Sequence, residues 1–207
     1  MEPSLPLLAL MGIFAYLLGS VSFAVWVSVW QGLPDPHSYG SGNPGATNVL
    51  RTGNRKAALW TLFGDAGKGA LAVAIAQATA DLHHQAELGV AVVALAAFFG
   101  HLYPIWHRFQ GGKGVATAAG VLLTLQPWMG LGTVLTWLAT AFVFRYSSLA
   151  ALAAAFVAPA FAYSLADGPA LVVAVSLMST LLVLRHRSNI KNLLRGEESK
   201  IGQRRGS

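Results

Sequence analysis

The stretch SYGSGNPGATNVLR, residues 38–51, decides how the chain is organised. Its three glycines, one proline, two asparagines and two serines are poor helix formers or compete for backbone hydrogen bonds, so we expect a shaped loop. Glycines let backbone N–H groups approach an anion closely, and the Arg51 guanidinium matches two phosphate oxygens. The alternative is a solvated turn between two hydrophobic segments.

Outside this loop the chain is apolar enough to lie in lipid. Of its 207 residues, 55% are hydrophobic and 11% are charged, and its mean hydropathy is +0.55. A soluble domain carries about 25% charged residues. The composition therefore predicts an all-α, polytopic membrane protein with a single transmembrane domain over residues 1–207. The sequence has no cysteine, which excludes disulfides, thiolate nucleophiles and Cys-type metal sites.

Seven apolar segments are predicted to span the membrane. They are, in order, 5–30, 57–78, 88–105, two short spans within 115–146 that meet at Gln126-Pro127, 149–165 and 169–184. A single span needs about 20 residues, so the stretch 115–146 is long for one span and short for two. Because the fourth span is short, six spans is the alternative.

The basic residues set the predicted orientation. Every Lys and Arg except Lys68 lies in the loops around Arg51 and Lys113, at Arg145, or from Arg185 onward. The positive-inside rule makes these segments cytoplasmic, with the amino end outside and the carboxyl end inside. Because Lys113 and Arg145 both lie inside, the chain between them must cross twice. The net charge of +6 is thus explained by anionic lipid, without nucleic acid as a partner.

The predicted cytoplasmic segments gather the polar residues that chemistry would need. The candidates are Ser41, Asn43, Gly45, Thr47, Asn48 and Arg51 in the first loop, His101, Gly111, Gly112, Lys113 and Gly114 in the second, Ser147 in the third, and His186 and Asn189 in the tail. The Gly-Gly-Lys-Gly turn has the parts of a phosphate-binding loop but lacks the Walker spacing, so ATP binding is not supported. Residues 196–207 are expected to be a flexible cytoplasmic tail.

Two ionisable residues, Asp65 and Lys68, lie three apart on one face of the second span. We favour a buried structural ion pair and keep Lys68 as a candidate phosphate ligand. His83 and His84 lack metal-ligand spacing and are interpreted as surface residues, so no metal site is predicted. His186 lies between two arginines, which disfavours protonation and suits a hydrogen-bonding or base role.

A combination of four motifs carries a family resemblance. The motifs are residues 40–48 with Arg51, the Asp65-x-x-Lys68-Gly69 step, Gly100-His101 followed by residues 111–114, and Arg185-His186-x-x-Asn189-Ile190. They resemble the bacterial acyl-phosphate:glycerol-3-phosphate acyltransferase family over nearly the whole chain. The resemblance implies a seven-span inner-membrane enzyme with a cytoplasmic active site. Such an enzyme makes lysophosphatidic acid from acyl phosphate and glycerol 3-phosphate and needs no soluble cofactor.

The resemblance also implies roles for particular residues. It makes Ser41, Arg51, His186 and Asn189 essential, gives the glycines around Lys113 to the glycerol-phosphate site, and gives Glu197 a structural role. Because acyl phosphate is already activated, we expect direct attack by the primary hydroxyl, with Arg51 and Lys113 holding the phosphates. Either His186 or a substrate phosphate accepts the hydroxyl proton.

Two other classes of function stay open. A transporter of a phosphorylated metabolite also presents Gly-rich backbone to an anion, although transporters usually show paired halves and polar groups at the bilayer midplane. A scaffold that recruits lipid enzymes through its basic tail would not need Arg51 or Lys113. The sequence lacks a His-x-x-x-x-Asp motif, which argues against an acyl-CoA or acyl-carrier-protein mechanism. It leaves the oligomeric state open, a monomer included.

Overall fold

The computed structural model describes residues 4–83 and 87–202, and its regular elements in those ranges are all helices, which confirms the all-α prediction. They are α1 (Leu5–Gly19), α2 (Phe23–Trp30), α3 (Ala46–Leu50), α4 (Arg55–His83), α5 (Glu87–Leu102), the 3-10 turn η1 (Ile105–His107), α6 (Val115–Leu125), α7 (Pro127–Phe144), α8 (Ser147–Leu165), α9 (Pro169–Arg185) and α10 (Arg187–Arg195). His83 and His84 were predicted to be surface residues, but the side chain of His83 and all of His84 lie outside the described part.

The first apolar run was predicted as one helix and consists of two, because the helix breaks between Ser20 and Ser22. The Ser22 hydroxyl accepts a hydrogen bond from the Val25 N–H and so caps α2. The Val21 carbonyl, left open by the break, accepts a hydrogen bond of 2.6 Å from the Lys68 ammonium. Side chains therefore stabilise the break.

The predicted break at Gln126-Pro127 is confirmed. Gln126 ends α6 and its side-chain oxygen accepts a hydrogen bond of 2.9 Å from the Met129 N–H, while Pro127 is the first residue of α7. The 11 residues of α6 rise only about 16 Å, against about 30 Å of hydrocarbon. Helix α6 is thus a short apolar helix within the bundle.

Length and hydropathy identify five candidate spans in the described part of the chain, and a sixth if α9 and α10, bent by 55° at His186, form one span. With the short α6, every one of the seven predicted segments is helical. The details differ from the prediction in several places. Helix α3 lies inside the first loop, α4 continues to His83 through the expected connection, and His101 lies in the last turn of α5.

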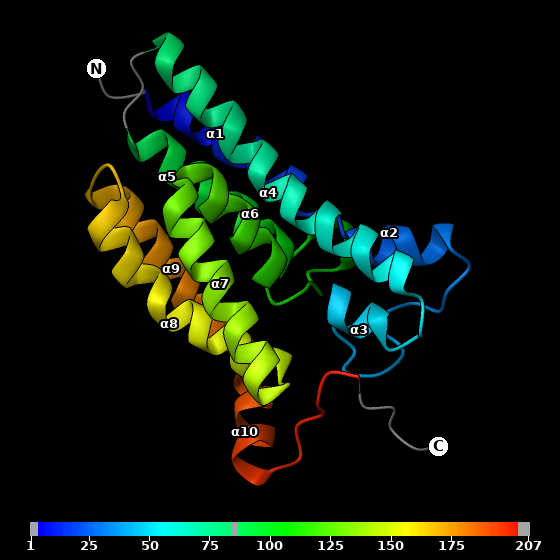
Figure 1. The fold of residues 1–207 in the computed structure, drawn as a ribbon. Coiled ribbons are helices and arrows are strands. Elements are labelled where there is room, and N and C mark those ends of the chain that lie inside the picture. Colours follow the sequence, from blue (N-terminus) through cyan, green and yellow to red (C-terminus); the bar gives the residue numbers. More distant parts are fainter. Residues whose placement is uncertain (1–3, 84–86, 203–207) are drawn as a thin grey trace.

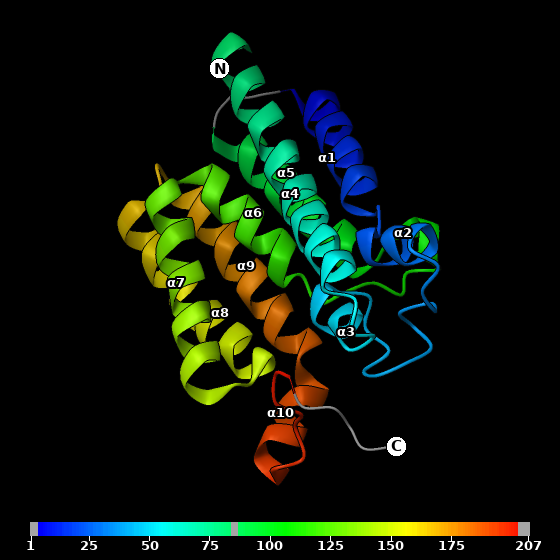
Figure 2. The ribbon, with the colours of Figure 1, turned by 45° about the vertical axis from the view of Figure 1, so that its right-hand side comes forward.

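Several predicted cytoplasmic segments gather at one end of the helical bundle. Figures 1 and 2 both show α3, the turn between α7 and α8, and α10 at this end, while the connections from α6 to α7 and from α8 to α9 lie at the other. Segments that are far apart in the sequence therefore meet on one face.

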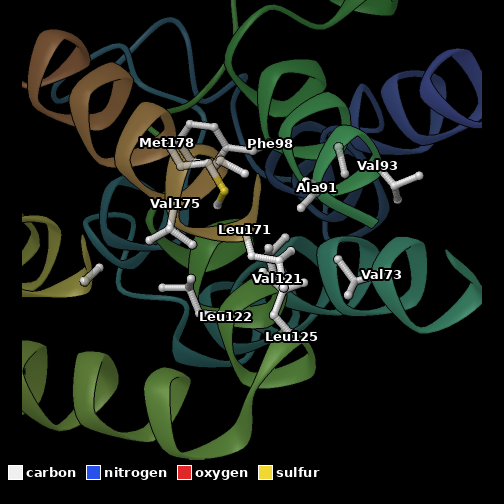
Figure 3. Packing of buried hydrophobic residues seen from close by; sticks show 14 of the residues in the cluster. Val73, Ala91, Val93, Phe98, Val121, Leu122, Leu125, Leu171, Val175 and Met178 are labelled. Carbon is white, nitrogen blue, oxygen red and sulfur yellow. The ribbon is translucent and has the colours of Figure 1, made fainter. Parts of the chain in front are cut away.

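The core is built mainly from α4, α5, α6 and α9. Figure 3 shows side chains from these helices facing one another, among them Val73, Phe98, Val121, Val175 and Met178. Glycines bring the backbones together at two crossings. A Cβ at Gly19 of α1 would collide with the Ala97 carbonyl of α5, and a Cβ at Gly120 of α6 would collide with the Ala66 carbonyl of α4.

Replacing Gly120 with alanine is expected to destabilise the fold, because the new methyl group would meet the backbone of α4. We expect a loss of about 1–3 kcal/mol, measured by thermal unfolding in detergent. Gly67→Ala is the matched control, since a Cβ at Gly67 meets open space and alanine favours the helix. Equal melting temperatures for the two variants would contradict the close α4–α6 packing.

Candidate active site

The first loop is held in shape by the side chain of Asn48, which is only 2% exposed. Its amide oxygen accepts hydrogen bonds from the Ser41 N–H (3.0 Å), the Ser41 hydroxyl (3.2 Å) and the Arg51 guanidinium (3.2 Å). Its amide nitrogen donates to the carbonyls of Pro36 (2.9 Å) and Tyr39 (3.2 Å). Asn48 thus fixes the positions of Ser41 and Arg51, the two residues predicted to be essential in this loop.

The remaining candidates of the first loop lie around α3. Gly45 is the residue before α3, Asn43 is half-buried beside it, and Thr47 lies within the helix. The hydroxyls of Thr47 and Ser147 are 3.1 Å apart, and Ser147 is the first residue of α8. The first and third predicted loops are therefore in contact.

The second loop is packed against the end of α5. The Gly112 N–H donates to the His101 carbonyl at 3.1 Å, and a Cβ at Gly112 would collide with the His101 ring. Gly114, the residue before α6, has a positive φ of 90°. One of the glycine N–H groups expected to hold phosphate is thus already bonded within the protein. The Lys113 ammonium in the same loop donates to the Asn189 amide oxygen.

The third motif begins where α9 ends. Arg185 donates to the Gly112 carbonyl at 3.2 Å and to the Gly111 carbonyl at 2.7 Å, so it ties α9 to the second loop. His186 is 3% exposed, and its Nδ1 is 2.8 Å from the Leu182 carbonyl. In the neutral ring, a proton on Nδ1 leaves Nε2 as a hydrogen-bond acceptor.

A chain of hydrogen bonds joins the second motif, the third motif and the tail. The Lys113 ammonium donates to the Asn189 amide oxygen at 2.5 Å, and the Asn189 amide nitrogen donates to the Glu198 carboxylate at 2.7 Å. The same carboxylate oxygen accepts a hydrogen bond of 2.7 Å from the Ser148 hydroxyl. Glu198 therefore ties the tail to α8 and α10, and Asn189 extends the chain of hydrogen bonds to the second loop.

The tail also reaches the first motif. The Arg51 guanidinium donates to the Ser199 hydroxyl at 2.8 Å, and the Ile201 N–H donates to the Arg145 carbonyl at 2.6 Å. A cleft of about 540 Å³ opens beside these contacts. Its lining residues are Arg145, Tyr146, Gly196, Glu197, Glu198, Ser199 and Lys200. The flexibility expected for residues 196–207 stays a prediction, and residues 203–207 lie outside the described part.

The predicted ion pair of the second span is confirmed. Asp65 and Lys68 lie 2.8 Å apart, and both are almost fully buried. The Asp65 carboxylate is also 3.5 Å from the His101 ring. Because the Lys68 ammonium is bonded to Asp65 and to the Val21 carbonyl, its contacts are structural. Its role as a phosphate ligand stays a prediction.

The structure thus connects Ser41, Asn48, Arg51, Lys113 and Asn189 through side-chain hydrogen bonds, directly or by way of the tail. Sequence reasoning missed Glu198 and Ser199, and gave Ser148 no role. It assigned the structural role to Glu197, whereas the structure gives these contacts to Glu198. A single sequence contains no signal that distinguishes the two adjacent glutamates.

Fold and site together define a class. The chain is a helical integral membrane protein with cations, amides and hydroxyls gathered at one end of the bundle.

Comparisons with known proteins give the family. Residues 9–196 match the family described as glycerol-3-phosphate acyltransferase. The chain is 60% identical to the glycerol-3-phosphate acyltransferase of Cupriavidus taiwanensis, over 95% of this chain and 97% of that protein. It is 61% identical to the protein of the same name from Burkholderia pseudomallei (strain K96243), over 92% of this chain and 94% of that one.

Two crystal structures of PlsY (YgiH), an integral membrane glycerol 3-phosphate acyltransferase, have the same fold. The glycerol 3-phosphate form aligns with a TM-score of 0.87 at 36% identity and covers 94% of this chain and 96% of that chain. The lysophosphatidic acid form aligns with a TM-score of 0.85 at 36% identity, over 94% of this chain and 95% of that chain. The chain therefore belongs to the glycerol-3-phosphate acyltransferase family and is a membrane enzyme.

Asp65→Asn is expected to destabilise the protein, because it leaves the Lys68 cation buried without its carboxylate partner. Removing one partner of a buried pair costs about 3–5 kcal/mol, and we expect a matching fall in the thermal unfolding temperature. Adding Lys68→Met should recover part of this loss by removing the charge. If Asp65→Asn unfolded at the wild-type temperature, the pair would contribute nothing to the fold.

Anion binding at this site is expected to weaken above about pH 8. Burial, with smaller effects of Arg51 and Arg185, lowers the pKa of Lys113 to about 8 from 10.5, and Glu198 opposes this shift. The ammonium is therefore lost as the pH rises through about 8. Calorimetric titration with glycerol 3-phosphate at pH 7, 8 and 9 measures the effect. Lys113→Arg should make the affinity for glycerol 3-phosphate nearly independent of pH in this range. A wild-type affinity that is the same at pH 9 as at pH 7 would contradict the assignment of Lys113 as an anion ligand.

Proposed function

We propose that this enzyme transfers a fatty acyl group from acyl phosphate to the sn-1 hydroxyl of glycerol 3-phosphate, giving lysophosphatidic acid and phosphate. The reaction takes place at the cytoplasmic face of the bacterial inner membrane and is the first acylation of phospholipid synthesis. The membrane fold, the family and the two ligand forms of the solved relative support this proposal.

One observation carries the proposal: Arg51 and Lys113, from separate loops, are joined through Ser199, Glu198 and Asn189 at one end of the bundle. Two cations close to one another suit two phosphorylated reactants, because each phosphate needs a charged donor. The same feature favours an enzyme over the alternative, a transporter of a phosphorylated metabolite, whose binding site lies near the bilayer midplane.

The chemistry requires little covalent help from the protein. The glycerol oxygen forms a bond to the acyl carbonyl carbon, the bond from that carbon to the phosphate oxygen breaks, and phosphate leaves with the bonding electrons. Positioning and charge stabilisation supply most of the acceleration. Two acceptors are available for the hydroxyl proton, the Nε2 of His186 and the departing phosphate.

The residues divide into two groups. Arg51 and Lys113 bind the phosphates, with Ser41, His186 and Asn189 as further catalytic contacts. The loop residues Asn43, Gly45, Thr47, Asn48, Gly111, Gly112, Gly114 and Ser147, with Lys68 and His101, shape the substrate site. Glycerol 3-phosphate enters from water at the end of the bundle where these loops gather, while the acyl chain lies between helices and enters from lipid.

The test is an assay with the purified protein in phospholipid nanodiscs. Palmitoyl phosphate and radiolabelled glycerol 3-phosphate should give lysophosphatidic acid and an equal amount of phosphate, and palmitoyl-CoA should give no product. Product with the thioester alone would overturn the donor assignment.

Arg51→Lys is a sharper test within the same assay. Lysine keeps the charge and loses the paired donors, so kcat/KM is expected to fall about 10- to 100-fold. Arg55→Lys, at the exposed start of α4, is the matched control and should stay within about twofold of wild type. Equal kinetics for the two variants would remove Arg51 from the phosphate site.

A further inference from the structure

The tail places a carboxylate among the groups that are proposed to bind phosphate. Glu198 accepts hydrogen bonds from Asn189 and Ser148, both at 2.7 Å, and its backbone neighbour Ser199 is bonded to Arg51. Because like charges repel, a carboxylate beside a phosphate site weakens phosphate binding. Its presence there therefore indicates a compensating task. Its contacts indicate what that task is.

The Asn189 amide connects a cation to an anion. Its oxygen accepts from the Lys113 ammonium and its nitrogen donates to Glu198. An amide that flipped would direct its NH2 group at the ammonium and its oxygen at the carboxylate, and both contacts would be unfavourable. Glu198 therefore fixes the orientation of the amide, and the amide fixes the direction of the long Lys113 side chain, which otherwise has many rotamers.

The preceding residue provides a natural comparison. Glu197 is exposed, and its backbone N–H donates to the Asn192 carbonyl at 2.8 Å just after α10. Gly196 ends α10 with a positive φ of 71°, which turns the chain back toward the site. Two adjacent glutamates thus have the same charge and different surroundings.

We propose that Glu198 is a positioning residue for this acyl transfer: its carboxylate orients the Asn189 amide, which aims the Lys113 ammonium at the substrate phosphate. Its negative charge also keeps that ammonium protonated. The inference rests on the proposed function of Lys113 and goes beyond it, because Glu198 itself need not touch the substrate.

The charges around Lys113 give the proposal a measurable signature. Glu198 faces it from the tail, Arg51 from the segment after α3, and Arg185 and His186 from the junction of α9 and α10. Among these, Glu198 alone favours the protonated ammonium, and the arginines oppose it. Removing the carboxylate charge therefore lowers the pH at which Lys113 loses its proton.

Three variants test this in the nanodisc assay. Glu198→Gln should lower kcat/KM for glycerol 3-phosphate about 10- to 100-fold, the range of a lost charged hydrogen bond, and should move the alkaline limb of the pH profile to lower pH. Glu198→Asp keeps the charge, so its alkaline limb should stay at the wild-type pH although kcat/KM falls. Glu197→Gln is the matched control and should resemble wild type in both respects.

Calorimetric titration with glycerol 3-phosphate separates this proposal from the function itself. If wild type neither binds glycerol 3-phosphate nor forms product, the proposed function fails. If wild type does both, and Glu198→Gln keeps the wild-type alkaline limb with kcat/KM within twofold, the positioning role is overturned. A role confined to docking the tail would lower thermal stability and leave the limb unmoved. If Glu198→Gln does not fold, an alkaline limb of Glu198→Asp at clearly lower pH than that of wild type would overturn the proposal, because aspartate keeps the negative charge.

Discussion

The structure depends on one buried cation, the Lys68 ammonium. Hydrocarbon cannot hydrogen-bond to an open carbonyl, so the break between α1 and α2 needs a partner for Val21, and Lys68 supplies it. The cost of burying the ammonium is offset by Asp65. Asp65 also lies 3.5 Å from His101, whose carbonyl holds the Gly112 N–H. A single network therefore links the helix break to the loop that presents Lys113.

Close packing at glycines also stabilises the fold, independently of the buried Lys68. Close approach of α1 to α5 and of α4 to α6 is possible because glycines face carbonyls at the crossings. Apolar side chains gain little free energy when they move from lipid to a contact between helices. Close packing of this kind therefore supplies much of the free energy of helix association. It also makes the bundle rigid enough to hold loops from different helices at fixed positions.

The sequence predicted the helical segments well, but it predicted only some of the features between them. The break at Gln126 was predictable because Pro127 cannot continue a helix and the charges on both sides demanded two crossings. The break at Val21 was not, because its partner Lys68 is 47 residues away. Among the site residues, Arg51 and Lys113 were candidates by type. Glu198 was not, since its importance comes from contacts with Asn189 and Ser148 that exist only in the folded chain.

The distance along the chain between the partners of the site has a consequence for biosynthesis. Arg51 and Ser199 are 148 residues apart, so the contact between them forms only after residue 199 has left the ribosome. A nascent chain with its helices up to α9 already inserted has Arg51 and Lys113 but lacks Glu198 and Ser199. Such a chain therefore lacks the contacts through which the tail joins the two cations.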